Sequence, residues 1–241
     1  MNQNIKIFED IGQIAEEFAS TVQKLALKNE NNPVHIALSG GSTPKAIFKY
    51  LTENYGTKLN FTNLHFWWGD DRCVPPFHTD SNFKWANELW LSPAGFSDEQ
   101  IHRVKGENNP KEEAIRYSEE IKKYVPTENG WPVFDLILLG LGEDGHTASI
   151  FPNQMELLKS NRICEIATHP KSGQKRVSFT GYIINNARKV IFLSTGTSKS
   201  EKVRQVIDER DLSLPATHIR PANGKLIWWI DNHAAEFIGE L

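Results

Sequence analysis

The sequence predicts an α/β protein whose mostly parallel sheet is covered by helices on both faces. Short, continuously apolar runs recur along the chain, and such runs are typical of strands buried on both faces of a parallel sheet. Segments with apolar residues at helical spacing separate these runs, as in parallel α/β folds. With 39% hydrophobic and 24% charged residues, the composition is that of an ordinary globular protein.

The first half of the chain opens with an amphipathic helix. Ile11, Ile14 and Phe18 recur at three- and four-residue spacing, which places them on one helical face. Pro44 suits the first position of a second helix, because its fixed φ is helical and its missing N–H is not needed there. In order, we expect a helix over 10–28, a strand over 34–38, a helix from Pro44 capped by Ser42 or Thr43, a strand over 64–69, a polar loop, and helices over 80–91 and 110–124.

The second half continues the alternation. FDLILLGL, residues 134–141, is the strongest strand candidate because it is almost entirely apolar. After it we expect a strand in RVSFT, which starts at Arg176, a strand over 189–195, a helix over 198–207 and a strand over 225–231. No repeat, low-complexity tract or Pro/Ser-rich linker interrupts the pattern, so we expect a single domain over residues 1–241. In a two-domain alternative, the boundary would fall at 108–110 or 126–132.

Charge and cysteine content exclude several classes of protein. The net charge of −3 gives no basic surplus for nucleic acid or an anionic membrane. The N-terminal residues lack a signal-peptide pattern, and no run approaches the ~18 apolar residues of a membrane span, so we expect a cytoplasmic protein. Cys73 and Cys164 are too few and too far apart for a disulfide framework, and the histidines lack ligand spacing, so no metal site is expected.

The strand at 134–141 leads into a glycine triplet. Gly140, Gly142 and Gly145 spell G-x-G-x-x-G, the pattern of a dinucleotide-binding turn. Such a turn must be followed by a full helix, but Pro152 leaves room for barely two helical turns, and proline inside a helix costs ~3 kcal/mol. The pattern therefore favours either a plain structural turn or a site built on the polar residues within it.

Asp144 and His146 are the chemically capable residues of this turn. Both follow the carboxyl end of a predicted parallel strand, where ligands bind in open α/β sheets. Histidine titrates near neutral pH, and a nearby carboxylate can orient its ring and support its charged form. His146 is thus a candidate general base and Asp144 its partner.

Three further loops follow predicted strands and could bind an anion. In SGGSTPK, glycines and the hydroxyls of Ser42 and Thr43 gather donors at the positive end of a helix. Arg72 ends GDDR and could clamp an anion or stabilise an oxyanion. Lys199 stands at a helix start, where a cation is poorly matched to the helix dipole unless an anionic ligand lies nearby. Each feature could instead be a turn or a solvated surface without a ligand.

Five motifs occur together in the order LSGGSTP, GDDR-x-VP with DSN downstream, LGLGEDGHTASIFP, RVSFT-x-x-x-INNA and GTSKSEKV. This series resembles the 6-phosphogluconolactonase branch of the glucosamine-6-phosphate isomerase/6-phosphogluconolactonase family over about residues 34–231. The resemblance implies a modified Rossmann-like sandwich that hydrolyses 6-phospho-D-glucono-1,5-lactone to 6-phospho-D-gluconate in the oxidative pentose phosphate pathway. It implies no metal and no organic cofactor.

The resemblance also suggests roles for residues. It implies a phosphate subsite formed by Gly40, Gly41, Ser42, Thr43 and Lys199, with Arg72 and Arg176 as further substrate contacts. As a mechanism, we expect His146 to activate water, Asp144 to orient His146 or share its proton, and Arg72 or backbone N–H groups to stabilise the oxyanion. The expected partner is a small sugar phosphate, with no nucleic acid and no membrane. The sequence does not set the oligomeric state, for which a monomer is favoured.

Other functions remain open from the sequence alone. The related deaminases carry Asn-Glu-Pro after their Asp-Gly-His, whereas here Ser149 to Pro152 supply no acid. Asp71 also departs from the lactonases, which commonly have glutamate there. A glucosamine-6-phosphate deaminase, a non-catalytic sugar-phosphate sensor and an NAD oxidoreductase are the alternatives. Ammonia release would identify the deaminase, and binding without turnover would identify the sensor. Nicotinamide binding would identify the oxidoreductase.

Overall fold

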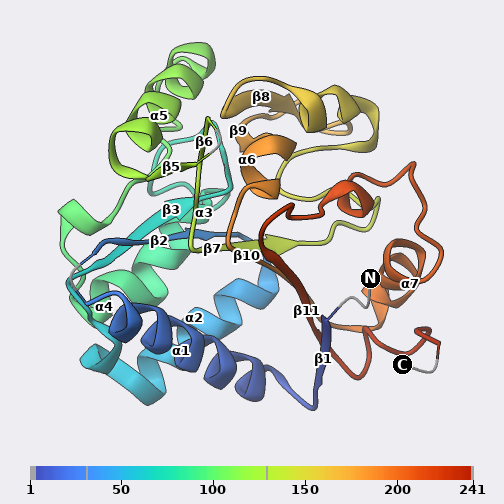
Figure 1. The fold of residues 1–241 in the computed structure, drawn as a ribbon, viewed down its shortest axis with the longest axis horizontal. Coiled ribbons are helices and arrows are strands. Elements are labelled where there is room, and N and C mark those ends of the chain that lie inside the picture. Colours follow the sequence, from blue (N-terminus) through green and yellow to red (C-terminus); the bar gives the residue numbers. More distant parts are fainter. Residues whose placement is uncertain (1–3, 31, 129, 240–241) are drawn as a thin grey trace.

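In the computed structural model, which describes residues 4–30, 32–128 and 130–239, the fold is built on one six-stranded sheet (Figure 1). All its strand pairings are parallel, in the order β1-β11-β10-β7-β2-β3. The strands are β1 (Asn4–Phe8), β2 (Val34–Leu38), β3 (Leu64–Trp68), β7 (Leu136–Gly140), β10 (Lys189–Ser194) and β11 (Lys225–Asp231). The predicted α/β class is therefore confirmed.

Helices connect these strands and cover both faces of the sheet. The α-helices are α1 (Ile11–Lys28), α2 (Ser42–Tyr55), α3 (Asn82–Ala86), α4 (Ser92–Ala94), α5 (Pro110–Tyr124), α6 (Gly181–Asn185) and α7 (Ser200–Ile207). A π-helical turn, Asn87–Leu91, joins α3 to α4, and 3₁₀ helices lie at Gly56–Leu59, Asp98–Gln100, Pro152–Lys159, Thr197–Lys199 and Pro215–His218. None of the described helices is long and apolar enough to cross a membrane.

Two hydrophobic cores lie on the two faces of the sheet because successive strand side chains point to opposite sides. Trp68 packs into the core beneath α1 and α2, while its neighbour Trp67 packs into the core beneath α5. Both indoles are fully buried, as expected for consecutive residues of a strand covered on both faces. At roughly 1.5–3 kcal/mol for each large apolar side chain buried, these cores hold the strand ends in place.

A second, antiparallel sheet was not predicted from the sequence. It has three strands in the order β4-β9-β8, namely β4 (Asp70–Arg72), β9 (Lys175–Phe179) and β8 (Cys164–Thr168). A small hairpin, β5 (Thr127–Glu128) with β6 (Trp131–Pro132), completes the strands. The polar loop expected after β3 is thus partly wrong, since Asp70–Arg72 form a strand. The polar sequence of Asp70–Arg72 gives no strand signal, and only the pairing with β9 identifies β4.

The second predicted helix also starts earlier than expected. Its N-cap is Gly41, with φ 108°, and Ser42 is the first helical residue, so neither Ser42 nor Thr43 caps it. A positive φ of this size is accessible to glycine and strained for other residues. No side chain caps α2, so the first backbone N–H groups of this helix have no side-chain acceptor among the described residues.

A buried histidine of β2, His35, and a half-buried one of β3, His65, lie on the face covered by α5. Trp67 Nε1 donates to His35 Nδ1 at 3.1 Å, and His35 is almost completely buried. His65 Nδ1 lies 3.0 Å from His102 Nε2, and His102 in turn pairs with Glu120 at 2.9 Å. Burial, and then the neighbouring His65 and His102, lower the pKa of His35 to about 3.

We expect this histidine to make the fold sensitive to acid. The unfolded state protonates His35 near pH 6.5 but the folded state only near pH 3, so stability falls as pH falls through that interval. The loss at pH 3 is roughly 4 kcal/mol for this group. The substitution His35→Asn, which keeps an acceptor for Trp67, should flatten the dependence of unfolding free energy on pH. Denaturant titrations from pH 7 to 4 measure it, with His233→Asn, an exposed histidine, as control. Equal slopes for both variants would contradict the assignment.

Candidate active site

The carboxyl ends of β2 and β7 lie side by side at the point where the strand order reverses. β2 pairs with β7 on one side and with β3 on the other, so the connections after β2 and after β7 run in opposite directions. Ligands bind at such switch points in open α/β sheets. A pocket of about 200 Å³ occurs here, and it is lined by the predicted residues Gly40, Gly41, Arg72, His146, Arg176 and Lys199.

His146 is held by the carboxylate two residues before it. His146 Nδ1 lies 2.5 Å from Asp144 Oδ1, which also accepts a hydrogen bond from the His146 backbone N–H at 3.1 Å. Because an ionised carboxylate only accepts, Nδ1 carries the hydrogen and Nε2 keeps its lone pair. The imidazole packs on the ring of Phe151, with centroids 4.7 Å apart. The histidine is therefore oriented by one nitrogen and able to take a proton on the other.

Asp144 is ionised in this arrangement. Burial alone would raise its pKa, but the hydrogen bond and the charge of His146 lower the pKa of Asp144 to about 2. Asp144 lines an adjoining hollow of about 540 Å³, together with His146 and Lys199, and not the smaller pocket itself. This location behind the imidazole suits an orienting group.

The glycine triplet serves to bring His146 into this position. Gly142 N–H donates to His146 O at 2.9 Å, and Gly145 adopts φ 81°, which turns the chain tightly between them. A Cβ atom on Gly142 would lie 2.1 Å from His146 Nδ1, so any larger residue there would displace the imidazole or the turn. The helix that a dinucleotide site requires does not follow, because Pro152–Lys159 is a 3₁₀ segment broken at Gln154.

Two arginines face the pocket from adjacent strands of the small sheet. Arg72 on β4 and Arg176 on β9 are register partners, and the Nε–H of each is buried without a hydrogen-bond partner among the described residues. Arg72 Nη1 donates to Asp80 O at 2.7 Å, and Arg176 lies over Phe151 with its guanidinium carbon 5.5 Å from the ring centroid. Two neighbouring guanidinium groups that line one pocket favour an anionic or strongly polarised ligand there.

Asp70 and Ser149 hold Arg176, and neither was predicted from the sequence. Ser149 Oγ donates to Asp70 Oδ2 at 2.6 Å, and Arg176 Nη1 donates to Ser149 Oγ at 3.4 Å. All three side chains are buried. Burial lowers the pKa of Arg176, while the nearby Asp70 raises it. Ser149 lies in the segment where the deaminases carry Asn-Glu-Pro. Here its hydroxyl accepts a hydrogen bond from Arg176.

Asp71 shapes the loop that carries Arg72 and Asn82. Its carboxylate accepts backbone hydrogen bonds from Arg72, Asn82 and Phe83, at 2.7, 2.7 and 3.0 Å. Burial raises the pKa of Asp71 to about 6, and these backbone donors oppose that rise. Asn82, which belongs to the DSN motif and lines the pocket, packs so closely on Gly40 that a Cβ there would lie 1.8 Å from Asn82 Oδ1.

The remaining predicted phosphate residues divide into two groups. Gly40 and Gly41 line the pocket beside Lys199, which is the N-cap residue of α7. Ser42 and Thr43 do not line it. The hydroxyl of Thr43 instead lies 2.7 Å from Thr195 Oγ1, which joins the start of α2 to the end of β10. The four loops singled out in the sequence therefore do converge, but the two hydroxyls do not reach the pocket.

Two polar groups beside His146 gave no sequence signal. His169 and Lys171 line the adjoining hollow, and His169 packs edge-on against Phe151 with centroids 5.4 Å apart. They lie in a loop between β8 and β9 whose position depends on the unpredicted small sheet. Across the described part of the chain, no group of three His, Cys, Asp or Glu side chains is arranged to hold a metal ion.

Comparison with known proteins gives consistent matches. A family model described as glucosamine-6-phosphate isomerases/6-phosphogluconolactonase matches residues 9–228. The 6-phosphogluconolactonase of Haemophilus influenzae is 42% identical over 231 residues, 95% of each chain, and that of Treponema pallidum is 43% identical over 209 residues, 87% of this chain and 86% of the relative. The solved 6-phosphogluconolactonase of Trypanosoma brucei superposes with a TM-score of 0.88 at 26% identity and covers 99% of both chains.

Proposed function

Because the chain belongs to the glucosamine-6-phosphate isomerase/6-phosphogluconolactonase family, we propose that it hydrolyses 6-phospho-D-glucono-1,5-lactone to 6-phospho-D-gluconate by water that His146 activates. The lactonase activity, in the oxidative pentose phosphate pathway, follows from relatives that match almost the whole chain. The observation that supports the histidine mechanism is the Asp144–His146 pair, whose imidazole lines the same pocket as Arg72, Arg176 and Lys199.

In this mechanism His146 Nε2 accepts a proton from water as the water oxygen attacks C1 of the lactone. The carbonyl π electrons move onto the carbonyl oxygen, and Arg72 or backbone N–H groups of the glycine turn stabilise that oxyanion in this proposal. Collapse of the tetrahedral intermediate breaks the bond between C1 and the ring oxygen. The ring oxygen then takes up the proton that His146 accepted from water. Asp144 stays ionised throughout and stabilises the imidazolium, as its low pKa allows.

The phosphate subsite consists, in this proposal, of the uncapped start of α2 and the ammonium of Lys199. Backbone N–H groups at the amino end of a helix carry partial positive charge and bind phosphate well. Gly40 and Gly41 let that backbone approach the pocket, and Lys199 faces it from the start of α7. An anion bound between them would also remove the mismatch between a lysine and the helix dipole.

Lys199→Ala should raise KM for the phosphorylated lactone by roughly 10- to 100-fold, the effect of one lost charge-assisted contact, with little change in kcat. Hydrolysis of unphosphorylated glucono-1,5-lactone should be almost unaffected. The matched control is Lys202→Ala, also at the start of α7, whose ammonium donates to Gln205 Oε1 at 2.6 Å and lines neither hollow. Equal effects on both lactones would place the phosphate elsewhere.

The activity itself is tested by product analysis. Lactone freshly generated from glucose 6-phosphate should disappear far faster than it hydrolyses spontaneously, with one acid released per lactone. Glucosamine 6-phosphate should release no ammonia, because Ser149 supplies no carboxylate beside His146. Ammonia release without lactone hydrolysis would support the deaminase instead. Together with this activity we propose a cytoplasmic, monomeric enzyme that acts on a small sugar phosphate without nucleic acid.

A further inference from the structure

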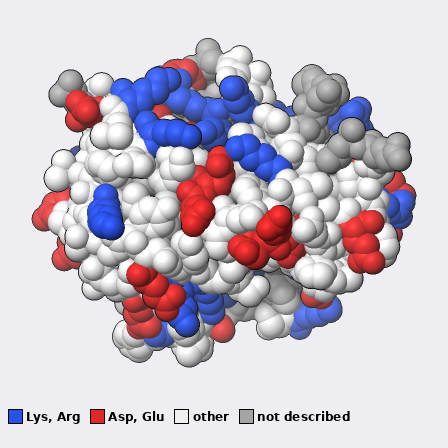
Figure 2. Space-filling model, turned by 90° about the horizontal axis from the view of Figure 1, so that it is seen from below, with Lys and Arg blue, Asp and Glu red and all other residues white. Residues whose placement is uncertain are grey.

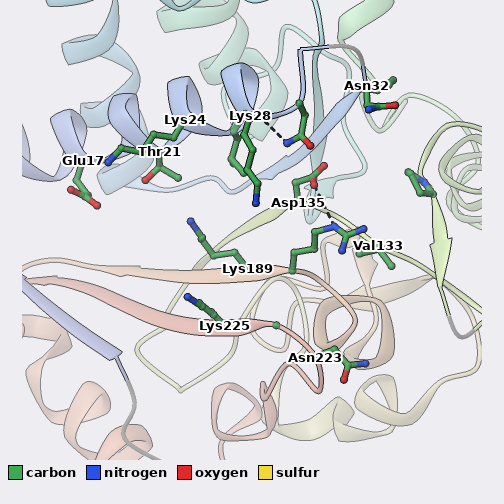
Figure 3. A pocket seen from close by; sticks show the side chains of 16 residues that line it. Glu17, Thr21, Lys24, Lys28, Asn32, Val133, Asp135, Lys189, Asn223 and Lys225 are labelled. Carbon is green, nitrogen blue, oxygen red and sulfur yellow. Dashed lines mark hydrogen bonds and ion pairs between the residues drawn. The ribbon is translucent and has the colours of Figure 1, made fainter.

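A second cavity, of about 930 Å³, lies at the edge of the main sheet opposite the candidate active site. It is bordered by α1 and by the amino ends of the strands, since Asp135 immediately precedes β7 and Lys189 and Lys225 are the first residues of β10 and β11. Figure 3 shows the side chains of Lys28, Lys189 and Lys225 directed into the space between α1 and these strands. The mechanism proposed above uses no residue of this cavity.

The cavity has an excess of positive charge. Its basic side chains are Lys24, Lys28, Arg188, Lys189 and Lys225, and its acidic ones are Glu17 and Asp135. On the face seen from below in Figure 1, several Lys and Arg side chains gather toward the upper edge, with acidic side chains beside them (Figure 2). This local surplus contrasts with the net charge of −3 for the whole chain.

Both acids of the cavity already have partners. Glu17 Oε1 pairs with Lys6 Nζ at 2.6 Å, and Asp135 accepts the His35 backbone N–H at 2.9 Å and lies 3.5 Å from Arg188 Nε. Arg188 is further neutralised by Glu128 at 2.6 Å. The four lysines are different, because none of them forms an ion pair with any acid in the described ranges.

Lys189 is the least favourable of these unpaired charges. Its side chain is half-buried between Lys225 and α1. Burial lowers the pKa of Lys189, and Lys225, Lys6 and Lys24 lower it further, with Glu17 opposing them. Like charges in a concave surface focus a positive potential, which a bound anion would relieve.

We propose that this cavity, the lysine pocket, binds a small organic molecule that carries at least two phosphate groups through Lys24, Lys28, Lys189 and Lys225. Lys24 and Lys28 stand on α1 and the other two on the sheet edge, so the four ammonium groups come from two opposite walls and exceed what one phosphate neutralises. The volume fits a nucleotide-sized ligand, since small-molecule sites span roughly 300–1,000 Å³. A recessed pocket in a chain of negative net charge favours a small polyanion over nucleic acid.

The test is a calorimetric titration of the full chain with ATP and with inorganic tripolyphosphate, at near-physiological salt and with saturating 6-phosphogluconate to occupy the active site. Both probes should bind one per chain. Lys189→Gln/Lys225→Gln should weaken binding roughly tenfold or more, as expected for two lost charge-assisted contacts. Lys24→Gln/Lys28→Gln, on the exposed side of α1, should weaken binding to the same extent. This variant replaces the first one in the test if Lys189→Gln/Lys225→Gln does not fold. Lys58→Gln/Lys159→Gln changes the net charge equally at exposed positions outside the pocket and should bind as the wild type does.

Several outcomes would overturn the proposal. Equal weakening by Lys58→Gln/Lys159→Gln would show a general charge effect, and loss of binding on addition of 6-phosphogluconate would place the probe in the active site. Inorganic phosphate that binds as tightly as tripolyphosphate would argue for a single phosphate. A short single-stranded DNA that binds more tightly than ATP, and depends on the same lysines, would indicate a nucleic-acid surface instead.

Discussion

Replacing His146 with alanine is expected to lower kcat for lactone hydrolysis by roughly 10²- to 10⁴-fold, the usual contribution of a general base. Among the described residues that line the pocket, only His146 carries an imidazole, and the orienting carboxylate of Asp144 lies 2.5 Å from its Nδ1. The proposed phosphate subsite does not include His146, so the affinity for 6-phosphogluconate should change little. The loss should therefore appear in kcat and not in product binding.

Stopped-flow measurement of lactone disappearance, corrected for spontaneous hydrolysis, checks this prediction. His169→Ala is the matched control, because it removes a neighbouring imidazole that also packs on Phe151 but lines only the adjoining hollow. It should reduce kcat far less than His146→Ala does. Wild-type turnover in His146→Ala, with the fold intact by circular dichroism, would rule out the proposed base.

Gly142→Ala is expected to reduce turnover nearly as much without removing any catalytic group. The added methyl would lie 2.1 Å from His146 Nδ1 and 2.7 Å from Asp144 Oδ1, so the imidazole or the turn must move. A displacement of about 1 Å can cost about 10²-fold in rate, because the attacking water and the base lose their alignment. Here too kcat should fall while product affinity remains.

Gly69→Ala provides the comparison for this substitution. Gly69 lies at the end of β3 on the same edge of the sheet, but its added methyl would come no closer than 3.9 Å to Leu38 O. Steady-state kinetics and thermal unfolding of both variants separate the effect on His146 from a general loss of stability. If both variants lost activity equally, the contact between Gly142 and His146 would not be its cause.

The main sheet could be predicted because its signals are local. FDLILLGL is apolar on both faces, and residues 110–124 show helical spacing behind a proline, so β7 and α5 occur where expected. The small sheet could not be predicted, because Asp70–Arg72 has no apolar pattern and forms a strand only by pairing with β9. Asn4–Phe8 and Cys164–Thr168 were missed because their alternation is short and weak.

The candidate site divides in the same way. Asp144, His146 and the glycines adjoin in sequence, and Arg72 and Lys199 stand in loops after predicted strands. Arg176 came from the family resemblance, which the family match confirms. Their chemical roles stay proposals. Asp70 and Ser149 support Arg176 through a hydrogen bond between residues far apart in the chain, and such a contact leaves no mark on a single sequence. The lysine pocket gave no sequence signal either, because its residues come from four separate elements.

The outer strand β1 pairs in parallel with β11, which places Asn4 opposite Ile227 and Phe8 opposite Asp231. During synthesis β1 therefore leaves the ribosome long before β11, the strand with which it pairs. Its backbone stays unpaired until the intervening residues have been synthesised. Contacts so distant along the chain close late and slow folding. The same pairing makes the chain a good candidate for circular permutation, because its two end strands are already neighbours and a new opening could be made in a surface loop.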